Sequence, residues 1–520
     1  MSISIPNIFT WFSNRGQECQ LPWLILGKGP SFSELHRHDT TGFRVLTLND
    51  AIRAVPHAAI AHFIDFDAFK RCADDLHRAE AVVLPWCPHF NNKPGRTLAD
   101  LLPGEPVLHD FWQQGRLYWY DLSTASARHG DFPVVSACFF SAEAALDLLA
   151  QAGVKRVRSL GIDGGSAYSK EFSDLFGVSL FSNGRRCFDR QFESFARIIS
   201  RTGIDYAPLD MESPVRIFVA ATASEALPVK VLAYSIRRHA SCAVKVTPLC
   251  DVGISIPKPR APENQPRTPF SFQRFLIPEV CGYEGHAIYL DSDMLVFKDM
   301  VKLWRRPLGD AAILAAYSTS ASGRKPQYSV MLMDCGKLGW NIREIVDQLD
   351  AGTLTYEQLM YTSSLARAHA DIEPEWNSLE SYREGRTALL HYTDMNTQPW
   401  VSHLNPLGHL WVCTLRNALR EGAISRDFVE EEIGHGHIRP SLLYQLDHGV
   451  DDAILLPKAI LAADAGVTPP YRSLGPHQAS PWRNRLQWLR ASIRARYRKT
   501  LLYRFERRVL NRLTDHRPDR

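Results

Sequence analysis

Five short apolar runs, each ending in glycine, proline or polar residues, recur in the first part of the chain. They are LPWLILGKGPSF (21–32), FRVLTLNDAI (43–52), AIAHFIDF (59–66), AEAVVLPW (79–86) and VRSLGIDGG (157–165). Such runs are typical of strands buried on both faces of a parallel sheet. A helical segment, SAEAALDLLAQAG (141–153), precedes the last run. The pattern predicts a Rossmann-like α/β domain over residues 15–205.

A second strand followed by a helix begins at SPVRIFVAATAS (213–224). In the helical segment, Val229, Leu232, Ala233 and Ile236 recur at the spacing of one helix face. Residues 251–268 are proline-rich and lack a period, which indicates a loop. We therefore expect a second α/β domain over 213–415, followed by a mixed extension over 416–475.

The length of 520 residues agrees with two or three domains. The ten cysteines are scattered, with no CxxC pair and no tight Cys/His cluster, which indicates buried, reduced thiols and neither a disulfide framework nor a zinc site. The N-terminus lacks a signal-peptide pattern, and no run approaches the roughly 20 apolar residues of a membrane span. We expect a soluble, cytoplasmic protein.

The segment AIYLDSDMLVF (287–297) ends an apolar strand with Asp291 and Asp293. Alternate residues of a strand share a face, so the two carboxylates can point the same way. Two carboxylates repel each other unless a cation lies between them. A hard divalent cation also binds phosphate oxygens. The pair thus indicates a metal site for a nucleotide diphosphate, and the alternative is a polar turn after a core strand.

Seven segments between residues 215 and 400 resemble, in the same order, those of family 8 glycosyltransferases of the GT-A fold. They are RIFVAATASE, TPFSFQRFLIPEV, AIYLDSDMLVFKDMVKLW, YSVMLMDCGKLGW, TYEQLMY, IEPEWNSL and HYTDMNTQPW. The resemblance implies a metal-dependent, retaining enzyme that moves a hexose from a UDP-sugar donor. The chain departs from the family at Tyr328 and Ser329, at Asp394, and at Gln398, where a lysine is usual. Without this lysine the phosphates have one positive charge fewer beside them, which bears on the affinity for the donor and on its identity.

The resemblance also implies a role for each matching residue. Asp291, Asp293 and His391 would bind Mn²⁺ or Mg²⁺, and Arg274 would neutralise charge on the diphosphate or sugar ring. The donor nucleotide would contact Ala220, Thr222, Ser224 and Ser292. Gln358 would lie beneath the donor sugar with Glu357 beside it. The alternative for these last two is the exposed start of a helix, and for His391 it is an ordinary hydrogen-bond partner.

The N-terminal domain resembles the Rossmann-type modules of bacterial sialyltransferases and of 6-hydroxymethylpterin pyrophosphokinase-like proteins. The resemblance rests on LILGKGPSF, VLTLNDAI and SACFFSAEAALDLLAQAGVKRVRSLGIDGG. A glycine loop after a first strand can bring backbone N–H groups close to a phosphate. A nucleotide would then be bordered by Gly27, Gly29, Ser31, Asn49 and Asp163. The alternative is a tight turn without a ligand.

The C-terminal tail, 480–520, is predicted to form a basic amphipathic helix. Apolar residues from Trp482 to Leu513 recur every three or four positions, and residues 482–520 hold thirteen Lys and Arg against three Asp and Glu. We expect this tail to lie on an anionic membrane surface; a protein partner or nonspecific nucleic-acid binding are alternatives. Nothing else in the sequence indicates nucleic-acid recognition.

Together these observations predict two Rossmann-like α/β domains and a transferase that acts on a surface-glycan acceptor, such as a lipopolysaccharide or capsule precursor. Two alternatives stay open. The N-terminal domain could hold the main or a second activity, with a CMP-sugar or related nucleotide. The chain could instead be a non-catalytic scaffold that binds a nucleotide sugar.

Overall fold

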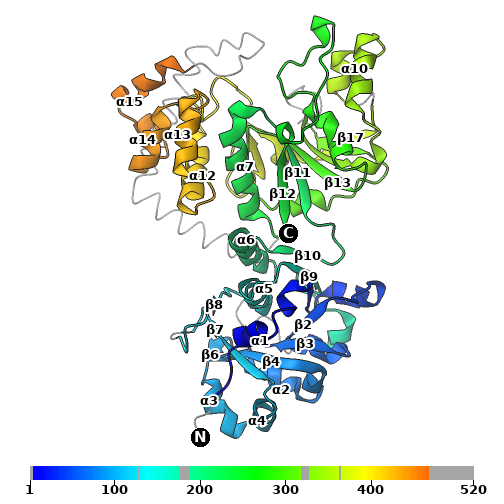
Figure 1. Cartoon of the computed structure of the whole chain (residues 1–520), viewed down its shortest axis with the longest axis vertical. Helices are drawn as coiled ribbons and strands as arrows, with labels where there is room; N and C mark the ends of the chain where they lie inside the picture. The colour runs from blue at the N-terminus through cyan, green and yellow to red at the C-terminus, as the bar shows by residue number, and fades with distance from the viewer. Residues whose placement is uncertain (1–3, 126–127, 176–186, 318–326, 362–364, 468–520) are drawn as a thin grey trace. The chain divides into compact units, whose positions relative to one another are not determined.

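The chain folds into two α/β units (Figure 1). The structure is a computed structural model that describes residues 4–467 except 126–127, 176–186, 318–326 and 362–364. One unit holds Met1–Val215 and Arg237–Lys245, and the other holds Arg216–Ile236 and the residues from Val246 onward. The predicted tail helix lies outside the described residues.

The first unit is built on an eight-stranded sheet of order β10-β9-β1-β2-β3-β4-β7-β8. Every strand pair in it is parallel, because the strands are joined by helical crossovers and loops over the faces of the sheet. The bounds are β1 (Trp23–Leu26), β2 (Arg44–Leu48), β3 (Ala58–His62), β4 (Ala79–Pro85), β7 (Leu117–Leu122), β8 (Val134–Val135), β9 (Arg156–Leu160) and β10 (Asp205–Pro208). The predicted parallel α/β layer is confirmed.

The strand order reverses direction at β1. From β1 the chain adds β2, β3, β4 and β7 on one side, and it then returns to place β9 on the other side of β1. Helices α2 (Phe66–Arg71), α3 (Leu98–Leu101), α4 (Pro106–Gln113), α5 (Ser141–Gln151) and α6 (Gln191–Thr202) connect the strands. Ligands of open α/β sheets bind at such a switch point, beyond the carboxyl ends of the strands.

The first unit begins earlier than the predicted residue 15. Helix α1 (Ile8–Asn14) buries Ile8, Phe9, Trp11 and Phe12, and the Trp119 indole donates to the Ile5 carbonyl over 2.8 Å. The apolar side chains of this segment belong to the core of the unit.

The second unit has a six-stranded sheet of order β12-β11-β13-β16-β15-β17 and a three-stranded sheet of order β14-β19-β18. The larger sheet is mixed: β11–β13 and β15–β17 pair in parallel, whereas β13–β16 and β15–β16 are antiparallel. Its strands are β11 (Val215–Ala220), β12 (Val244–Pro248), β13 (His286–Asp291), β15 (Ile313–Ala316), β16 (Gln327–Asp334) and β17 (Ala368–Ile372); the smaller sheet has β14 (Met294–Val296), β18 (Ser378–Leu379) and β19 (Leu389–His391).

The predicted boundary at residue 415 is wrong, because it falls inside a helix of the second unit. Helix α12 (Gly408–Arg420) buries Trp411, Val412, Leu415 and Ala418 along one face. This face belongs to one apolar cluster with α7 (Ala226–His239), α13 (Arg426–Gly434), α14 (Ser441–His448) and strand β19. Buried residues from Ala418 to Leu442, expected to lie in a separate extension, therefore belong to the core of the second unit. The other helices of the unit are α8 (Ile277–Val280), α9 (Val301–Trp304), α10 (Ile342–Asp350), α11 (Tyr356–Met360) and α15 (Lys458–Ala462).

Two further expectations from composition are tested by the structure. Of the ten cysteines, three are buried (Cys72, Cys242 and Cys335), so the prediction of buried thiols is wrong for the rest. Among the described helices, none has the length and apolar character needed to cross a bilayer.

Candidate metal centre

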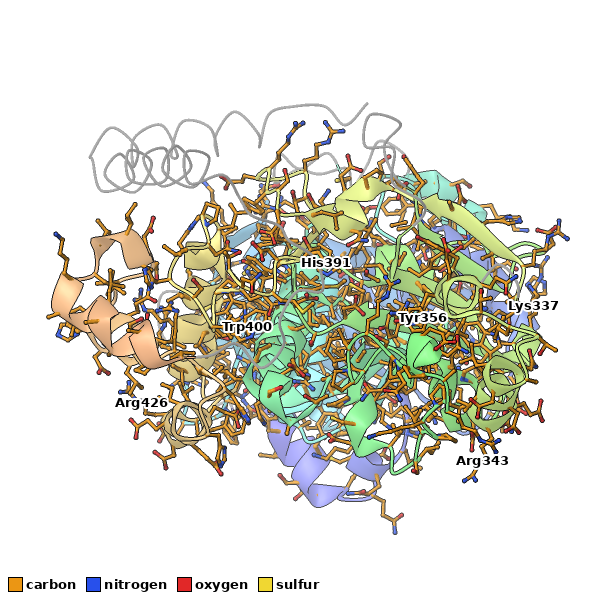
Figure 2. The ribbon with its side chains drawn as sticks, turned by 90° about the horizontal axis from the view of Figure 1, so that it is seen from above. Lys337, Arg343, Tyr356, His391, Trp400 and Arg426 are labelled. Atoms are coloured by element: carbon orange, nitrogen blue, oxygen red, sulfur yellow. The ribbon has the colours of Figure 1, made fainter. Side chains whose placement is uncertain are left out.

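The two aspartates and the distant histidine meet where the two sheets of the second unit adjoin. Asp291 is the last residue of β13, and Asp293 precedes β14. Strand β19 pairs antiparallel with β14 and sets His391 opposite Met294, while the Tyr392 N–H donates to the Asp293 carbonyl over 2.8 Å. This register brings the histidine beside the aspartates although a long stretch of chain separates them. His391 lies in the interior of the unit, whereas Lys337 and Arg343 lie at its periphery (Figure 2).

Asp291, Asp293 and His391 form one cluster. One potential ligand atom from each lies within 4.8 Å of the others. His391 Nε2 is 3.0 Å from Asp293 Oδ1, an ion pair when the imidazole is protonated. Asp293 Oδ1 is buried and accepts no other hydrogen bond among the described residues. A buried carboxylate oxygen of this kind calls for a cation beside it, either the imidazolium or a metal ion.

A buried asparagine orients the imidazole. His391 Nδ1 lies 2.9 Å from Asn377 Oδ1, so Nδ1–H donates to this amide oxygen in the arrangement shown. The lone pair of Nε2 then faces the two aspartates. Ligating histidines commonly donate their second N–H to such a partner, which fixes the tautomer and the ring.

Burial and the neighbouring charges shift the pKa values of the cluster. Burial raises the pKa of Asp291; Arg274 opposes this shift and Asp293 adds to it. Burial disfavours the imidazolium form of His391, but Asp293, Asp291 and Glu380 outweigh it and raise the pKa of His391. A metal ion bound here would displace any proton from Nε2, because ligating imidazole must be neutral.

The donor set fits a divalent ion such as Mn²⁺ or Mg²⁺. Two carboxylates and one imidazole suit a borderline-hard cation that also takes phosphate oxygens. Adjacent ligands of an octahedral Mg²⁺ bound at about 2.1 Å lie about 3 Å apart. The separation of 3.0 Å between Asp293 Oδ1 and His391 Nε2 agrees with two such ligands.

Arg274 lies beside the cluster. Its Nη1 donates to the Tyr328 carbonyl over 3.1 Å, and its Nη2 is 3.9 Å from Asp291 Oδ1. Its Nε is buried and has no hydrogen-bond partner within the described part of the chain. The guanidinium lies over the Tyr289 ring, 4.7 Å from its centre, and the Tyr289 hydroxyl donates to Asp291 Oδ1 over 2.5 Å. Tyr289 thus holds both Arg274 and Asp291, a role that the sequence analysis missed.

The loop after β11 adjoins the aspartates, since Ala220 pairs with Asp291 in the sheet. Ala220 is fully buried, and the Thr222 and Ser224 hydroxyls donate to the carboxylate of Glu225 over 2.7 and 2.8 Å. Burial raises the pKa of Glu225, and the nearby Asp293 adds to the shift. The sequence analysis did not select Glu225, although the pattern TASE (222–225) is that of a capping box.

A buried glutamine holds the same loop. The Gln273 side chain accepts from the Ala221 N–H over 2.9 Å and donates to the Ala221 carbonyl over 2.8 Å. Its neighbour in sequence is Arg274. The segment 273–274 therefore positions both the loop after β11 and the aspartate pair.

Gln398 contacts the cluster directly. Its Nε2 donates to Asp293 Oδ2 over 2.9 Å and to the Tyr392 carbonyl over 3.1 Å. The residue at the usual lysine position thus supplies a neutral donor to Asp293. Ser292, expected at the nucleotide, is 3% exposed.

Glu357 and Gln358 lie on the exposed first turn of α11. Gln358 Oε1 accepts from the Thr355 N–H over 2.9 Å in a capping box. This placement agrees with the alternative weighed from sequence, the exposed start of a helix. Their expected catalytic role remains a prediction.

The first unit holds a cavity of about 460 Å³ at the switch point of its sheet. Four of the five residues selected there, Gly27, Gly29, Asn49 and Asp163, line this cavity, and Ser31 does not. Their N–H groups are not free for a phosphate: Gly27 donates to the Leu160 carbonyl, Gly29 to the Gly161 carbonyl and Ser31 to Asp163 Oδ2, each over 2.8 Å. The glycines instead allow two loops to touch, since a Cβ on Gly27 would lie 2.3 Å from the Gly161 oxygen.

Fold and site together define a two-unit α/β protein with a carboxylate–imidazole centre at the carboxyl edge of its second sheet. No protein-family model matches the chain. Similar curated proteins include Protein CDI of Arabidopsis thaliana, 33% identical over 94 residues that cover 18% of this chain and 36% of that protein. Probable galacturonosyltransferase-like 9 of the same plant is 30% identical over 177 residues, which cover 24% of this chain and 44% of that protein. The chain thus spans less than half the length of these relatives.

Similar solved structures include the glycosyltransferase GlyE of Streptococcus pneumoniae TIGR4, with 16% identity and a TM-score of 0.29 over 41% of this chain and 64% of that one. Another is a galactosyltransferase, LgtC, in complex with donor and acceptor sugar analogues, with 15% identity and a TM-score of 0.24 over 36% and 89% of the two chains. TM-scores this low carry no argument about the function of this chain.

Proposed function

We propose that the second unit is a metal-dependent, retaining glycosyltransferase that moves a hexose from a UDP-sugar to a surface-glycan acceptor. The observation that carries this proposal is the convergence of one ligand atom each from Asp291, Asp293 and buried His391 within 4.8 Å. The likeness to Probable galacturonosyltransferase-like 9 supports sugar transfer as the reaction class. The donor and acceptor classes rest on the resemblance of the seven motifs.

In this proposal Asp291, Asp293 and His391 hold Mn²⁺ or Mg²⁺. The bound ion neutralises the charge that develops on the departing diphosphate. Asn377 and Gln398 keep the ligands in place, and Arg274 adds a rigid cation beside Asp291. Ala220, Thr222, Ser224 and Ser292 border the nucleotide.

Retention of configuration follows from a front-face displacement. The bond between the anomeric carbon and the phosphate oxygen breaks as the acceptor oxygen bonds to that carbon, and the departing phosphate takes the acceptor proton. Such a step needs no carboxylate nucleophile on the enzyme. Glu357 and Gln358 would have to approach the donor sugar from the first turn of α11.

Metal-dependent release of UDP from a panel of UDP-sugars tests the proposal, with Asp293→Asn as the probe. Asp334→Asn is a matched control, because Asp334 ends β16 opposite His286, at the other edge of the sheet. We expect Asp293→Asn to lower the rate of UDP release at least about 100-fold, a loss of roughly 2.7 kcal/mol in transition-state stabilisation. Asp334→Asn should release UDP at the rate of the parent protein. Full activity of Asp293→Asn would refute the proposal; nucleotide-sugar binding without turnover with candidate acceptors would favour a scaffold.

The cavity of the first unit supports a second candidate function, a site for a CMP-sugar or related nucleotide. Asp65 lines the cavity, and burial and Asp67 raise the pKa of its carboxyl group. This carboxyl group has no hydrogen-bond partner among the described residues. Such a carboxylate can accept ribose or sugar hydroxyls. Calorimetry with CMP, and turnover of CMP-sugars by Asp293→Asn protein, test this function. Binding that Asp65→Asn does not weaken would count against it.

The tail 480–520 is proposed to hold the enzyme at an anionic membrane surface, close to a lipid-linked acceptor. Flotation with liposomes that contain anionic lipid, with and without residues 482–520, tests this role. Equal flotation of the two chains would contradict it.

A further inference from the structure

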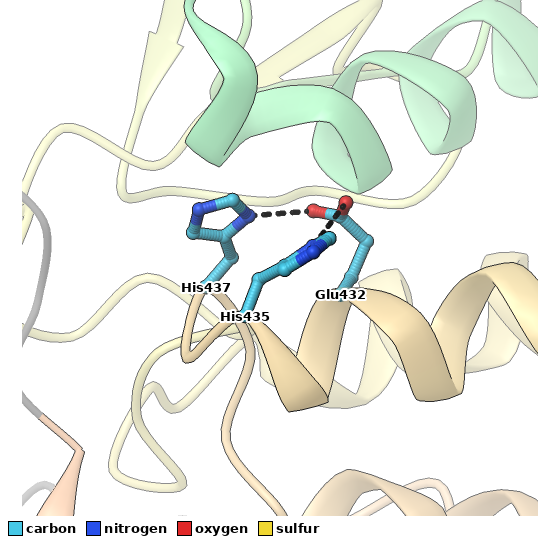
Figure 3. Close-up of side chains that lie close together, drawn as sticks. All are labelled: Glu432, His435 and His437. Atoms are coloured by element: carbon cyan, nitrogen blue, oxygen red, sulfur yellow. Dashed lines mark hydrogen bonds and ion pairs between the residues drawn. The ribbon is translucent and has the colours of Figure 1, made fainter.

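Three potential metal ligands converge at the end of α13, apart from the residues used above (Figure 3). His437 Nδ1 lies 3.0 Å from Glu432 Oε2, and His435 Nδ1 lies 3.8 Å from Glu432 Oε1. Figure 3 shows both imidazoles turned toward this one carboxylate. The cluster belongs entirely to the second unit.

The backbone fixes this arrangement. Gly436 has φ +76° and donates its N–H to the Ile433 carbonyl, and the His437 N–H donates to the Glu432 carbonyl. These two bonds form a Schellman motif, in which the residues at positions 432 and 437 come into contact. Apolar side chains commonly occupy these positions. Here they are a carboxylate and an imidazole, so the ligands are preorganised without any ion.

Glu432 is a buried carboxylate whose Oε2 lies within hydrogen-bond distance of His437 Nδ1. Its side chain is 7% exposed, and among the described residues its ion pairs are with His435 and His437 alone, not with a lysine or arginine. Buried carboxylates are normally paired with a cation or bound to a metal. A divalent ion held between the carboxylate and the two imidazoles would supply such a partner.

We propose that Glu432, His435 and His437 bind a divalent transition-metal ion of the Zn²⁺ type. Two imidazole nitrogens and one carboxylate oxygen are an established zinc ligand set. Tetrahedral ligands at about 2.0–2.2 Å from zinc lie about 3.4 Å apart. His437 Nδ1 is 3.0 Å from Glu432 Oε2, His435 Nδ1 is 3.8 Å from Glu432 Oε1, and one ligand atom from each residue lies within 4.8 Å of the others. His435 is half exposed, which gives the ion access from solvent.

The ion would stabilise the turn that leads to Arg439. This buried guanidinium donates through Nε to the Pro399 carbonyl over 2.8 Å, and the Arg439 N–H donates to the Trp400 carbonyl over 2.8 Å. Pro399 and Trp400 directly follow Gln398, which contacts Asp293. The role is therefore structural, and it does not depend on the proposed function. The sequence search looked for Cys/His clusters and missed a site whose third ligand is a glutamate.

The test uses the full chain without an affinity tag, in an Asp291→Asn/Asp293→Asn background that silences the other candidate centre. Zn²⁺ binding is measured by competition with a chromogenic chelator, and Co²⁺ absorption between about 500 and 650 nm reports four- or five-coordinate ligation. Substitution of a residue that only hydrogen-bonds to a metal ligand already lowers metal affinity roughly 10- to 100-fold. We therefore expect loss of His437 in His437→Ala to weaken Zn²⁺ binding at least about 100-fold.

His448→Ala is the matched control, because His448 is an exposed histidine at the end of α14. It should bind Zn²⁺ as the parent does. Glu432→Gln is a second probe that preserves the shape of the side chain, and thermal melting without metal verifies that each variant folds. Zn²⁺ affinity that is unchanged in folded His437→Ala or Glu432→Gln protein would overturn the proposal, as would no Zn²⁺ binding by the parent.

Discussion

Asn377 offers the sharpest test of the candidate metal centre, because its amide sets the direction of the imidazole. Asn377 is 6% exposed and accepts the His391 Nδ1–H over 2.9 Å. In Asn377→Leu the ring loses this acceptor, and a buried N–H is left without a partner. Loss of such an outer partner costs roughly 10- to 100-fold in metal affinity, which is about 1.4–2.7 kcal/mol.

The assay is a titration of the metal-free protein with Mn²⁺, followed by the electron paramagnetic resonance signal of free Mn²⁺. We expect a Kd about 10- to 100-fold higher for Asn377→Leu. Asn377→Asp should bind at least as tightly as the parent, because a carboxylate at this position raises the basicity of the ligating nitrogen.

A matched control separates metal affinity from stability. Asn341 caps α10 by accepting from the Arg343 and Glu344 N–H groups, and its replacement by alanine should cost about 1 kcal/mol of stability. Asn341→Ala should leave the Kd for Mn²⁺ unchanged. An unchanged Kd in Asn377→Leu, or equal weakening in Asn341→Ala, would refute the reasoning.

Three further predictions concern stability and are measured by urea unfolding. Gly161 has φ +75°, and a Cβ there would lie 2.6 Å from the Gly27 carbonyl carbon, whereas Gly203 has φ +67° and open space around it. Gly161→Ala should therefore lower the free energy of unfolding by about 1–3 kcal/mol more than Gly203→Ala does. Equal losses of stability in the two variants would contradict the close approach of the two loops. Trp411→Ala should cost about 3–5 kcal/mol, because the indole is fully buried between α12 and its neighbours, and a loss below about 1 kcal/mol would show that this helix is not part of the core. Burial opposes ionisation of Asp50, but Lys28 and Arg71 outweigh it and lower the pKa of Asp50. The contribution of ionised Asp50 to the free energy of unfolding is fully present above the pKa of aspartate in the unfolded chain, about 3.9. This contribution is lost as the pH falls through the pKa of Asp50 in the folded protein. The difference in unfolding free energy between the parent and Asp50→Asn should consequently narrow below about pH 4, and a constant difference from pH 7 to pH 3 would contradict the assignment.

The sequence identified the strands that carry chemistry but not every partner of those residues. Asp291, Asp293, Arg274 and His391 were all selected, and the structure brings them together. Tyr289, Asn377 and Glu225 were missed as partners, because each is ordinary in its own segment. Their importance arises from contacts across elements, and a single chain carries no signal for such contacts beyond the capping pattern at 222–225.

The glycine loop of the first unit shows why a local pattern can mislead. Gly27 and Gly29 indicated amides open to a phosphate, yet these amides donate to the loop after β9. Only the strand order, which places β9 beside β1, determines that the glycines face another backbone. The same strand order creates the cavity at the switch point.

By itself, the sequence determined two α/β parts, the strand that ends in Asp291, and a set of polar residues at strand ends. These follow from local periodicity and turn chemistry, which depend on residues close together in the chain. Only the tertiary structure decided that β14 and β19 pair with His391 opposite Met294, and that residues 408–448 pack into the second core. The reason is physical: strand register and helix packing are fixed by the burial of side chains from distant segments, and that burial exists only in the folded chain.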